Sequence, residues 1–172
     1  MNRFLLCLTA VLAAGCATAP DATSLERREL APTGVLRVAV FTGNPVIGSP
    51  DPVYGEPKGT TALLGRELAA QAGVPARIIE YTAAAKMTED TGAWDVAAAS
   101  CGSQSSGQFE FAPPHMIVGE RFAPTTEMCL VLPKGRTVAR NYVAGFVARA
   151  KSQGTVARAI ADAGLRGVSV AP

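Results

Sequence analysis

Val35-Leu36-Arg37-Val38-Ala39-Val40-Phe41 is a β-branched, nearly all-apolar run of strand length, and it decides the fold class. Such a run predicts a strand that is buried on both faces. After a loop rich in proline and glycine, residues 61–72 carry apolar side chains at every fourth position, as in an amphipathic helix. A second strand is expected at 76–81. Strand, helix and strand in this order predict a right-handed parallel crossover.

The remaining chain continues this alternation. Strands are expected at 94–99 and 127–132, and helices at about 136–152 and 155–163. The segment 82–91 is only weakly helical. The sequence therefore predicts an α/β domain with one small, mainly parallel sheet flanked by helices.

The N-terminus has the features of an export signal. A short positive start ending at Arg3 precedes an apolar run, Phe4 to Ala14. That run suits the apolar region of a signal peptide but is too short to span a bilayer, which takes about 20 residues. We therefore expect residues 1–15 to be a signal peptide.

The five residues at 12–16, Leu-Ala-Ala-Gly-Cys, resemble the lipobox of bacterial lipoprotein precursors. The resemblance makes Cys16 the first mature residue, modified by a lipid that includes palmitate and anchored on the periplasmic side of a bacterial membrane. The alternative is an ordinary secretory signal that is cleaved near Ala17-Thr18-Ala19 and leaves a soluble protein.

Residues 16–33 are rich in Ala, Thr and Pro and are expected to form a tether. Thr23 and Glu26 fit a capping box, so a short helix at about 24–30 is expected within it. Fully extended, such a tether would hold the domain roughly 55 Å from the membrane.

Composition limits the function classes. The chain has 172 residues, 48% of them hydrophobic, which suits one compact domain with its own core. It has 16 basic and 14 acidic residues and no basic patch, which argues against a nucleic-acid partner.

The four cysteines fall into two groups. Cys7 lies in the signal peptide and Cys16 is the lipid site, which leaves Cys101 and Cys129 in the folded part. An exported protein can bridge them, but two buried free thiols fit the sequence equally well.

Short segments then follow one another in the order found in a known family. They are Gly34–Val40, Gly55–Gly59, Arg66–Ala69, Gly73–Pro75, Gly92–Ala97 and Phe111–Pro114. Together they resemble the first lobe of the family 3 extracellular solute-binding proteins, receptors that deliver polar amino acids and related small solutes to ABC importers. The stretch from Pro133 to Ala157 resembles the end of such proteins.

The resemblance implies a single lobe of the periplasmic binding protein-like fold over residues 34–172. Residues 34–116 correspond to the first lobe, and 125–172 to the returning strand and C-terminal helices. Members of the family have two lobes that close on the ligand, and here residues 117–124 stand where the second should be. A truncated receptor would bury less of its ligand and bind it weakly.

The expected partners follow from the same resemblance: a small polar solute such as an amino acid, an ABC permease, and the membrane through the lipid anchor. The implied solute-binding residues are Phe41, Asn44, Ser100, Gly102 and Ser105. Ser105 stands where the family has an arginine that grips the α-carboxylate of the ligand. A hydroxyl donates only one neutral hydrogen bond, whereas a guanidinium donates two charge-assisted ones, so carboxylate recognition is weakened.

Other chemistry has little support in the sequence. Cys101 and His115, the one histidine, lack a third residue to orient them as a nucleophile and base. We expect no enzymatic activity, no cofactor and no metal. Two alternatives to solute binding stay open: an interaction lipoprotein that pairs, with itself as a homo-oligomer or with another chain, through the exposed interlobe face, and a decayed remnant that binds nothing.

Overall fold

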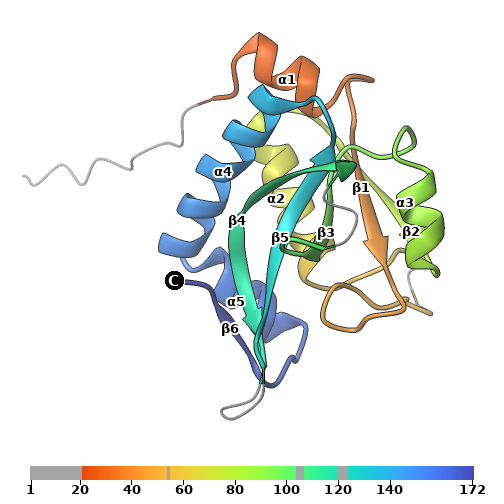
Figure 1. Ribbon diagram of the computed structural model, residues 1–172, viewed down its shortest axis with the longest axis vertical. Coiled ribbons are helices and arrows are strands. Elements are labelled where there is room, and N and C mark those ends of the chain that lie inside the picture. Colours follow the sequence, from red (N-terminus) through yellow and green to blue (C-terminus); the bar gives the residue numbers. More distant parts are fainter. Residues whose placement is uncertain (1–20, 54, 104–106, 120–123) are drawn as a thin grey trace, which may run out of the picture.

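The computed structural model describes residues 21–53, 55–103, 107–119 and 124–172 (Figure 1). Two sheets lie side by side. In the first, β1 (Leu36–Phe41) pairs in parallel with β2 (Ala76–Tyr81). The second is antiparallel, and its four strands have the order β3 (Ala97–Ser100), β5 (Thr126–Pro133), β4 (Phe109–Val118), β6 (Val168–Val170). A parallel bridge between Val38 and Val96 joins the two sheets.

Helices cover the sheets on both faces. The main core lies under α2 (Thr60–Ala72), α4 (Thr137–Ser152) and α5 (Thr155–Asp162), and includes the fully buried side chains of Leu68 and Phe146. The short helix α3 (Ala84–Glu89) borders a smaller cluster around Trp94, whose indole N–H donates to the carbonyl of Met87 at 2.8 Å. Trp94 is fully buried and is therefore a core residue.

The α/β class matches the prediction, but the sheets are mixed and not mainly parallel. Only seven residues, 119–125, connect β4 to β5. A parallel return needs a crossover of a dozen or more residues, so this connection can only produce an antiparallel pair. The first two residues of the predicted joint at 117–124 belong to β4 itself.

The sequence did not predict β4, because Pro113 and Pro114 lie in its middle and proline cannot donate to a strand ladder. The strand accommodates them through two register shifts against β5, between Phe111 and Pro114 and between Pro114 and Met116. On its other side β4 pairs with β6 only at residues 116–118, beyond the prolines. The missing N–H groups are therefore placed where the ladder is already irregular.

Helix α1 (Ser24–Leu30) begins with the predicted capping box, in which Thr23 and Glu26 exchange hydrogen bonds. It packs on α4, and Leu30 is fully buried. One carboxylate oxygen of Glu29 accepts from the N–H groups of Val138, at 2.9 Å, and Ala139, at 3.1 Å. The prediction of a tether over 16–33 is therefore wrong for residues 22–31, which are part of the folded domain.

Candidate functional site

The candidate site lies where β1 and β3 end. The parallel bridge between Val38 of β1 and Val96, just before β3, holds these two segments side by side in the same direction. A 2.8 Å hydrogen bond from the N–H of Ala39 to the carbonyl of Val96 strengthens this pairing. Phe41 and Ser100 are the last residues of these strands, so both lie at one edge of the structure. This edge is the place where parallel strands of α/β folds bind ligands.

The predicted solute-binding residues lie at this edge or in the loops that leave it. Asn44 comes three residues after β1 and Gly102 two residues after β3, so the structure brings the loops that carry four of the five predicted residues to the same edge. Ser105 lies outside the described residues. We call this region, Phe41–Asn44 with Ser100–Gly102, the strand-edge site.

Each loop is shaped by its own sequence. The side-chain oxygen of Asn44 accepts from the N–H of Val46 at 3.0 Å, so Asn44 stabilises its own turn. Phe41 is half-buried, and its ring lies so close to Gly43 that a Cβ atom there would come within 2.4 Å of it. Gly102 has a φ of 69°, a conformation that favours glycine. The backbone conformation therefore favours glycine at position 102, whereas Gly43 leaves room for the ring of Phe41.

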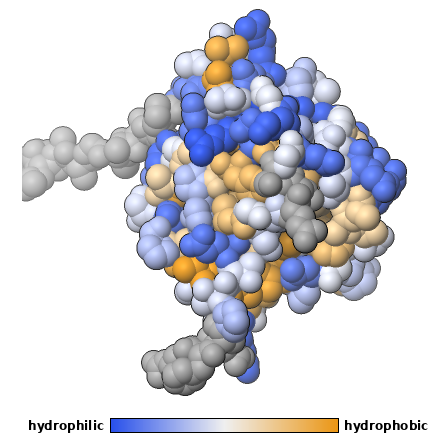
Figure 2. Space-filling model, in the orientation of Figure 1, coloured by the Kyte–Doolittle hydropathy of each residue, from blue (hydrophilic) through white to orange (hydrophobic). Residues whose placement is uncertain are grey.

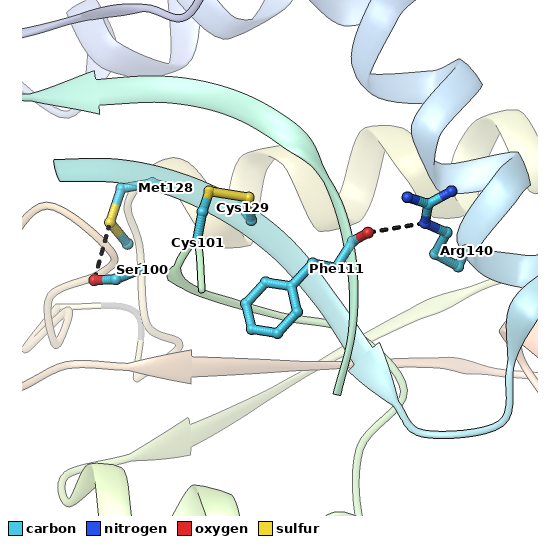
Figure 3. Close-up of a disulfide and its surroundings, with 6 residues drawn as sticks. All are labelled: Ser100, Cys101, Phe111, Met128, Cys129 and Arg140. Atoms are coloured by element: carbon cyan, nitrogen blue, oxygen red, sulfur yellow. Dashed lines mark hydrogen bonds between the residues drawn. A yellow bond between two sulfur atoms is a disulfide. The ribbon is translucent and has the colours of Figure 1, made fainter. Parts of the chain in front are cut away.

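A disulfide pins the second loop to the sheet (Figure 3). Cys101 follows β3 directly and is bonded to Cys129 of β5, with their Cα atoms 5.2 Å apart. The N–H of Cys101 also donates to the carbonyl of Glu127 at 2.9 Å. Of the two states that the sequence allowed for these cysteines, the structure has the bridge.

His115 lies on β4 and is about 1% exposed. Neither ring nitrogen has a hydrogen-bond partner among the described residues. Burial, and secondarily the charge of Lys151, lowers the pKa of His115 to about 4, so the imidazole is neutral at pH 7. Because the sulfur of Cys101 is in the disulfide, no thiol there can act as a nucleophile.

The strand-edge site offers hydrogen bonds but few charges. No lysine or arginine occurs in residues 41–49 or 100–107. The hydroxyl of Thr42 donates to the carboxylate of Glu80 at 2.9 Å, and the exposed hydroxyl of Ser100 lies 3.9 Å from the sulfur of Met128. Such groups can bind polar, uncharged parts of a solute, and they lack a cation for a carboxylate.

An apolar area lies beside these loops. In Figure 2 a hydrophobic patch is visible near the centre of the face, over β4 and β5, with hydrophilic residues around it. The half-buried side chains of Ala99, Cys101 and Phe111 pack at the margin of the Trp94 cluster. The guanidinium of Arg140 reaches the same strand and donates to the carbonyl of Phe111 at 2.9 Å (Figure 3).

The sequence did not predict a cavity on the flank of the domain that α2 and α5 form. It has a volume of about 540 Å³ and lies between α2, α5 and the loop that follows β1, away from the predicted solute-binding residues. The apolar pattern of α2 indicates which of its faces is buried, but no local pattern shows that α5 packs beside it.

Two further kinds of feature are absent from the part of the chain that the structure describes. There, no group of three or more His, Cys, Asp and Glu side chains is arranged to hold a metal ion. None of the described helices is long and apolar enough to cross a membrane.

Comparison with solved structures identifies the architecture. A solute receptor for L-cysteine of Neisseria gonorrhoeae superimposes with a TM-score of 0.70 at 15% identity, covering 87% of this chain and 100% of the other. The chain has the periplasmic binding protein-like fold. The arginine-bound form of domain 1 from TmArgBP has this fold too, with a TM-score of 0.60, 18% identity and coverage of 70% and 97%.

An ancestral cyclohexadienyl dehydratase shares the fold as well, with a TM-score of 0.68 and 15% identity over 86% of this chain and 99% of the other. No protein-family model matches the chain, and no curated protein matches it. At these identities the likeness shows the fold alone. Among these neighbours, the solute receptor agrees with the family that the sequence resembles.

Proposed function

We propose that this chain is an exported, lipid-anchored solute-binding protein of the ABC-importer type, which binds a small polar solute such as an amino acid at the strand-edge site. The observation that carries the proposal is the likeness of the whole fold to receptors for cysteine and arginine. The position of the predicted residues at the ends of two adjacent parallel strands supports it, because ligands of such folds bind there.

The chain acts with one lobe. Its short connection between β4 and β5 leaves no room for a second lobe within residues 119–125. A neighbour supports binding by a single lobe, because domain 1 from TmArgBP has been solved in an arginine-bound form. A solute held by one lobe keeps much of its surface in water, so we expect weak affinity.

The solute is recognised mainly through groups other than a carboxylate. The strand-edge site has hydroxyls, backbone groups and the carboxylate of Glu80, and no cation from its own loops. An amino-acid ligand would therefore be held through its side chain and ammonium group more than through its carboxylate.

Export and anchoring at Cys16 complete the proposal. The disulfide between Cys101 and Cys129 supports export, because such bridges persist in oxidising compartments such as the bacterial periplasm. A lipid on Cys16 would keep the receptor beside its permease. Labelling with a radioactive or alkyne-bearing palmitate, compared between the native chain and Cys16→Ser, tests the anchor: label on both chains would contradict it.

A thermal-shift screen of the standard amino acids tests the binding function, using a chain of residues 17–172 that keeps every described residue. A ligand at a hundredfold excess over its Kd stabilises by about 2.7 kcal/mol, which is easily measured. We expect a shift with at least one polar amino acid, and its loss in Ser100→Trp, which fills the exposed end of β3. Exposed Ser24→Trp in α1 is the control. No shift with any amino acid would favour the decayed remnant.

The apolar patch over β4 and β5 favours a second candidate, an interaction lipoprotein that pairs through this face, on which half-buried Phe111 of β4 can be tested. Light scattering on the same chain separates the two. A monomer that a solute stabilises would exclude pairing. A dimer that Phe111→Glu dissociates would show that the function is pairing and not solute binding.

A further inference from the structure

The cavity on the α2–α5 flank is large enough for a small ligand. Its volume of about 540 Å³ is within the range of small-molecule sites, which is roughly 300–1,000 Å³. Small and apolar side chains line part of it: Leu63, Ala70, Ala159 and Ala163. Because alanines line both helices, a ligand can approach their backbones closely and bury apolar surface against them.

The charges around the cavity are mostly neutralised within the protein. Arg66 pairs with Glu56 at 2.7 Å, and Lys58 pairs with Asp51 at 3.6 Å. Glu67 pairs with Arg158 of α5 at 3.3 Å, which ties the two helices together.

Asp162 differs from these residues. It lines the cavity at the end of α5, it is exposed, and no ion pair or hydrogen bond joins its carboxylate to the rest of the described chain. The cavity therefore combines a partly apolar lining with one carboxylate that has no ion-pair partner among the described residues.

We propose that this cavity is a second binding site, separate from the strand-edge site, and that it takes a small primary amine with an apolar body. The body packs on the alanines and on Leu63, and the ammonium lies beside Asp162. Most of the affinity comes from the apolar contact, because an exposed ion pair contributes little. The charge supplies the preference for an amine over a neutral molecule of the same shape.

The site does not depend on the proposed receptor function. None of Phe41, Asn44, Ser100 and Gly102 lines the cavity. Pro45, which does line it, directly follows Asn44, so the two sites share a loop without sharing a residue. Loss of one site is therefore measurable while the other is intact.

Benzylamine and benzyl alcohol are suitable probes because they have nearly the same shape and differ in charge at pH 7. Each is titrated into the ¹⁵N-labelled chain of residues 17–172 and followed by amide chemical shifts. We expect saturable shifts at 63–70 and 159–163 with benzylamine, and a weaker affinity for benzyl alcohol. Absence of shifts in these segments, or shifts confined to the strand-edge site, would overturn the proposal.

Two pairs of variants make the test specific. Asp162→Asn should weaken benzylamine binding about two- to fivefold, to the level of benzyl alcohol, whereas Glu89→Gln at an exposed position of α3 should leave it unchanged. Ala70→Phe should fill the cavity and abolish the shifts with both probes, whereas Ala85→Phe on the exposed face of α3 should not. Unchanged benzylamine affinity in Asp162→Asn refutes the role of the charge, even if Ala70→Phe does not fold.

Discussion

The guanidinium of Arg37 donates two hydrogen bonds to the carboxylate of Asp95, at 2.9 and 2.8 Å, and so fastens β1 to the residues that lead into β3. The same carboxylate accepts from the N–H of Arg37 at 2.9 Å and from Arg136, just before α4, at 2.8 Å. The side chain of Asp95 is completely buried. One carboxylate thus holds three segments together, at the end of β1 opposite the strand-edge site.

Removal of this carboxylate should be costly. Asp95→Ala leaves two arginines without their shared partner, and breaking a buried ion pair from one side destabilises by roughly 3–5 kcal/mol. Urea denaturation measures the change. Asp90→Ala is the control, because its pair with Lys86 is exposed and should contribute little to stability. Equal effects of the two substitutions would contradict a structural role for the Asp95 cluster.

Acid should destabilise the fold through His115. Its pKa is lowered from 6.5 to about 4 in the folded state, so the unfolded chain binds more protons between these values. Stability is therefore complete above pH 6.5 and falls as the pH is lowered towards 4, by about 3 kcal/mol at most.

His115→Met should flatten this part of the profile, because it removes the titrating group and keeps an apolar side chain of similar size. Asp95 does not act in the same range. Burial alone would raise its pKa, but hydrogen bonds from Arg37 and Arg136 hold the pKa of Asp95 below its ordinary value of 3.8, so its contribution is lost only in stronger acid. Denaturation at several pH values checks this, and an unchanged slope in His115→Met would assign the effect elsewhere.

Docking of α1 should contribute to stability. Leu30→Ala should cost roughly 2–5 kcal/mol, as for other leucines that are removed from a packed core. Glu29→Ala should cost about 1 kcal/mol, because two N–H groups at the start of α4 lose their acceptor. Arg28→Ala, at an exposed position of the same helix, is the control. If all three variants have the melting temperature of the native chain, α1 is not part of the cooperative fold.

Loss of the disulfide should lower the melting temperature. The bridge closes a loop between residues 28 positions apart, which corresponds to roughly 2–4 kcal/mol. Cys101→Ala with Cys129→Ala, and separately a reductant on the native chain, should have similar effects. A reductant that also lowers the melting temperature of the double variant would show that the change does not come from this bridge.

Local patterns predicted much of the fold. The strand at 76–81 and the helix at 155–162 were predicted within a residue. Gly73 and Pro75 mark the start of the strand, and the helix has a clear apolar period between Gly154 and Gly164. The capping box of α1 was predicted from two residues, since its hydrogen bonds join positions three apart.

Features that depend on distant contacts were missed. A seven-residue helix has too few apolar positions to indicate burial, so the packing of Leu30 on α4 could not be read from the sequence. The same limit left the cysteine bridge undecided, because the bridge depends on the pairing of β3 with β5. It also concealed the cavity, which exists because Ala159 and Asp162 lie near α2.

The packing of α1 also limits where an anchored protein can stand. If Cys16 carries the lipid, only residues 17–21 separate it from the folded domain, and they reach at most roughly 20 Å. The α1 end would then be held near the bilayer, whereas the strand-edge site lies at the other end of β1 (Figure 1). To bring the strand-edge site to a permease, the domain would have to lie with β1 roughly parallel to the membrane. An anchored domain of this kind would therefore be confined to the membrane surface beside its transporter.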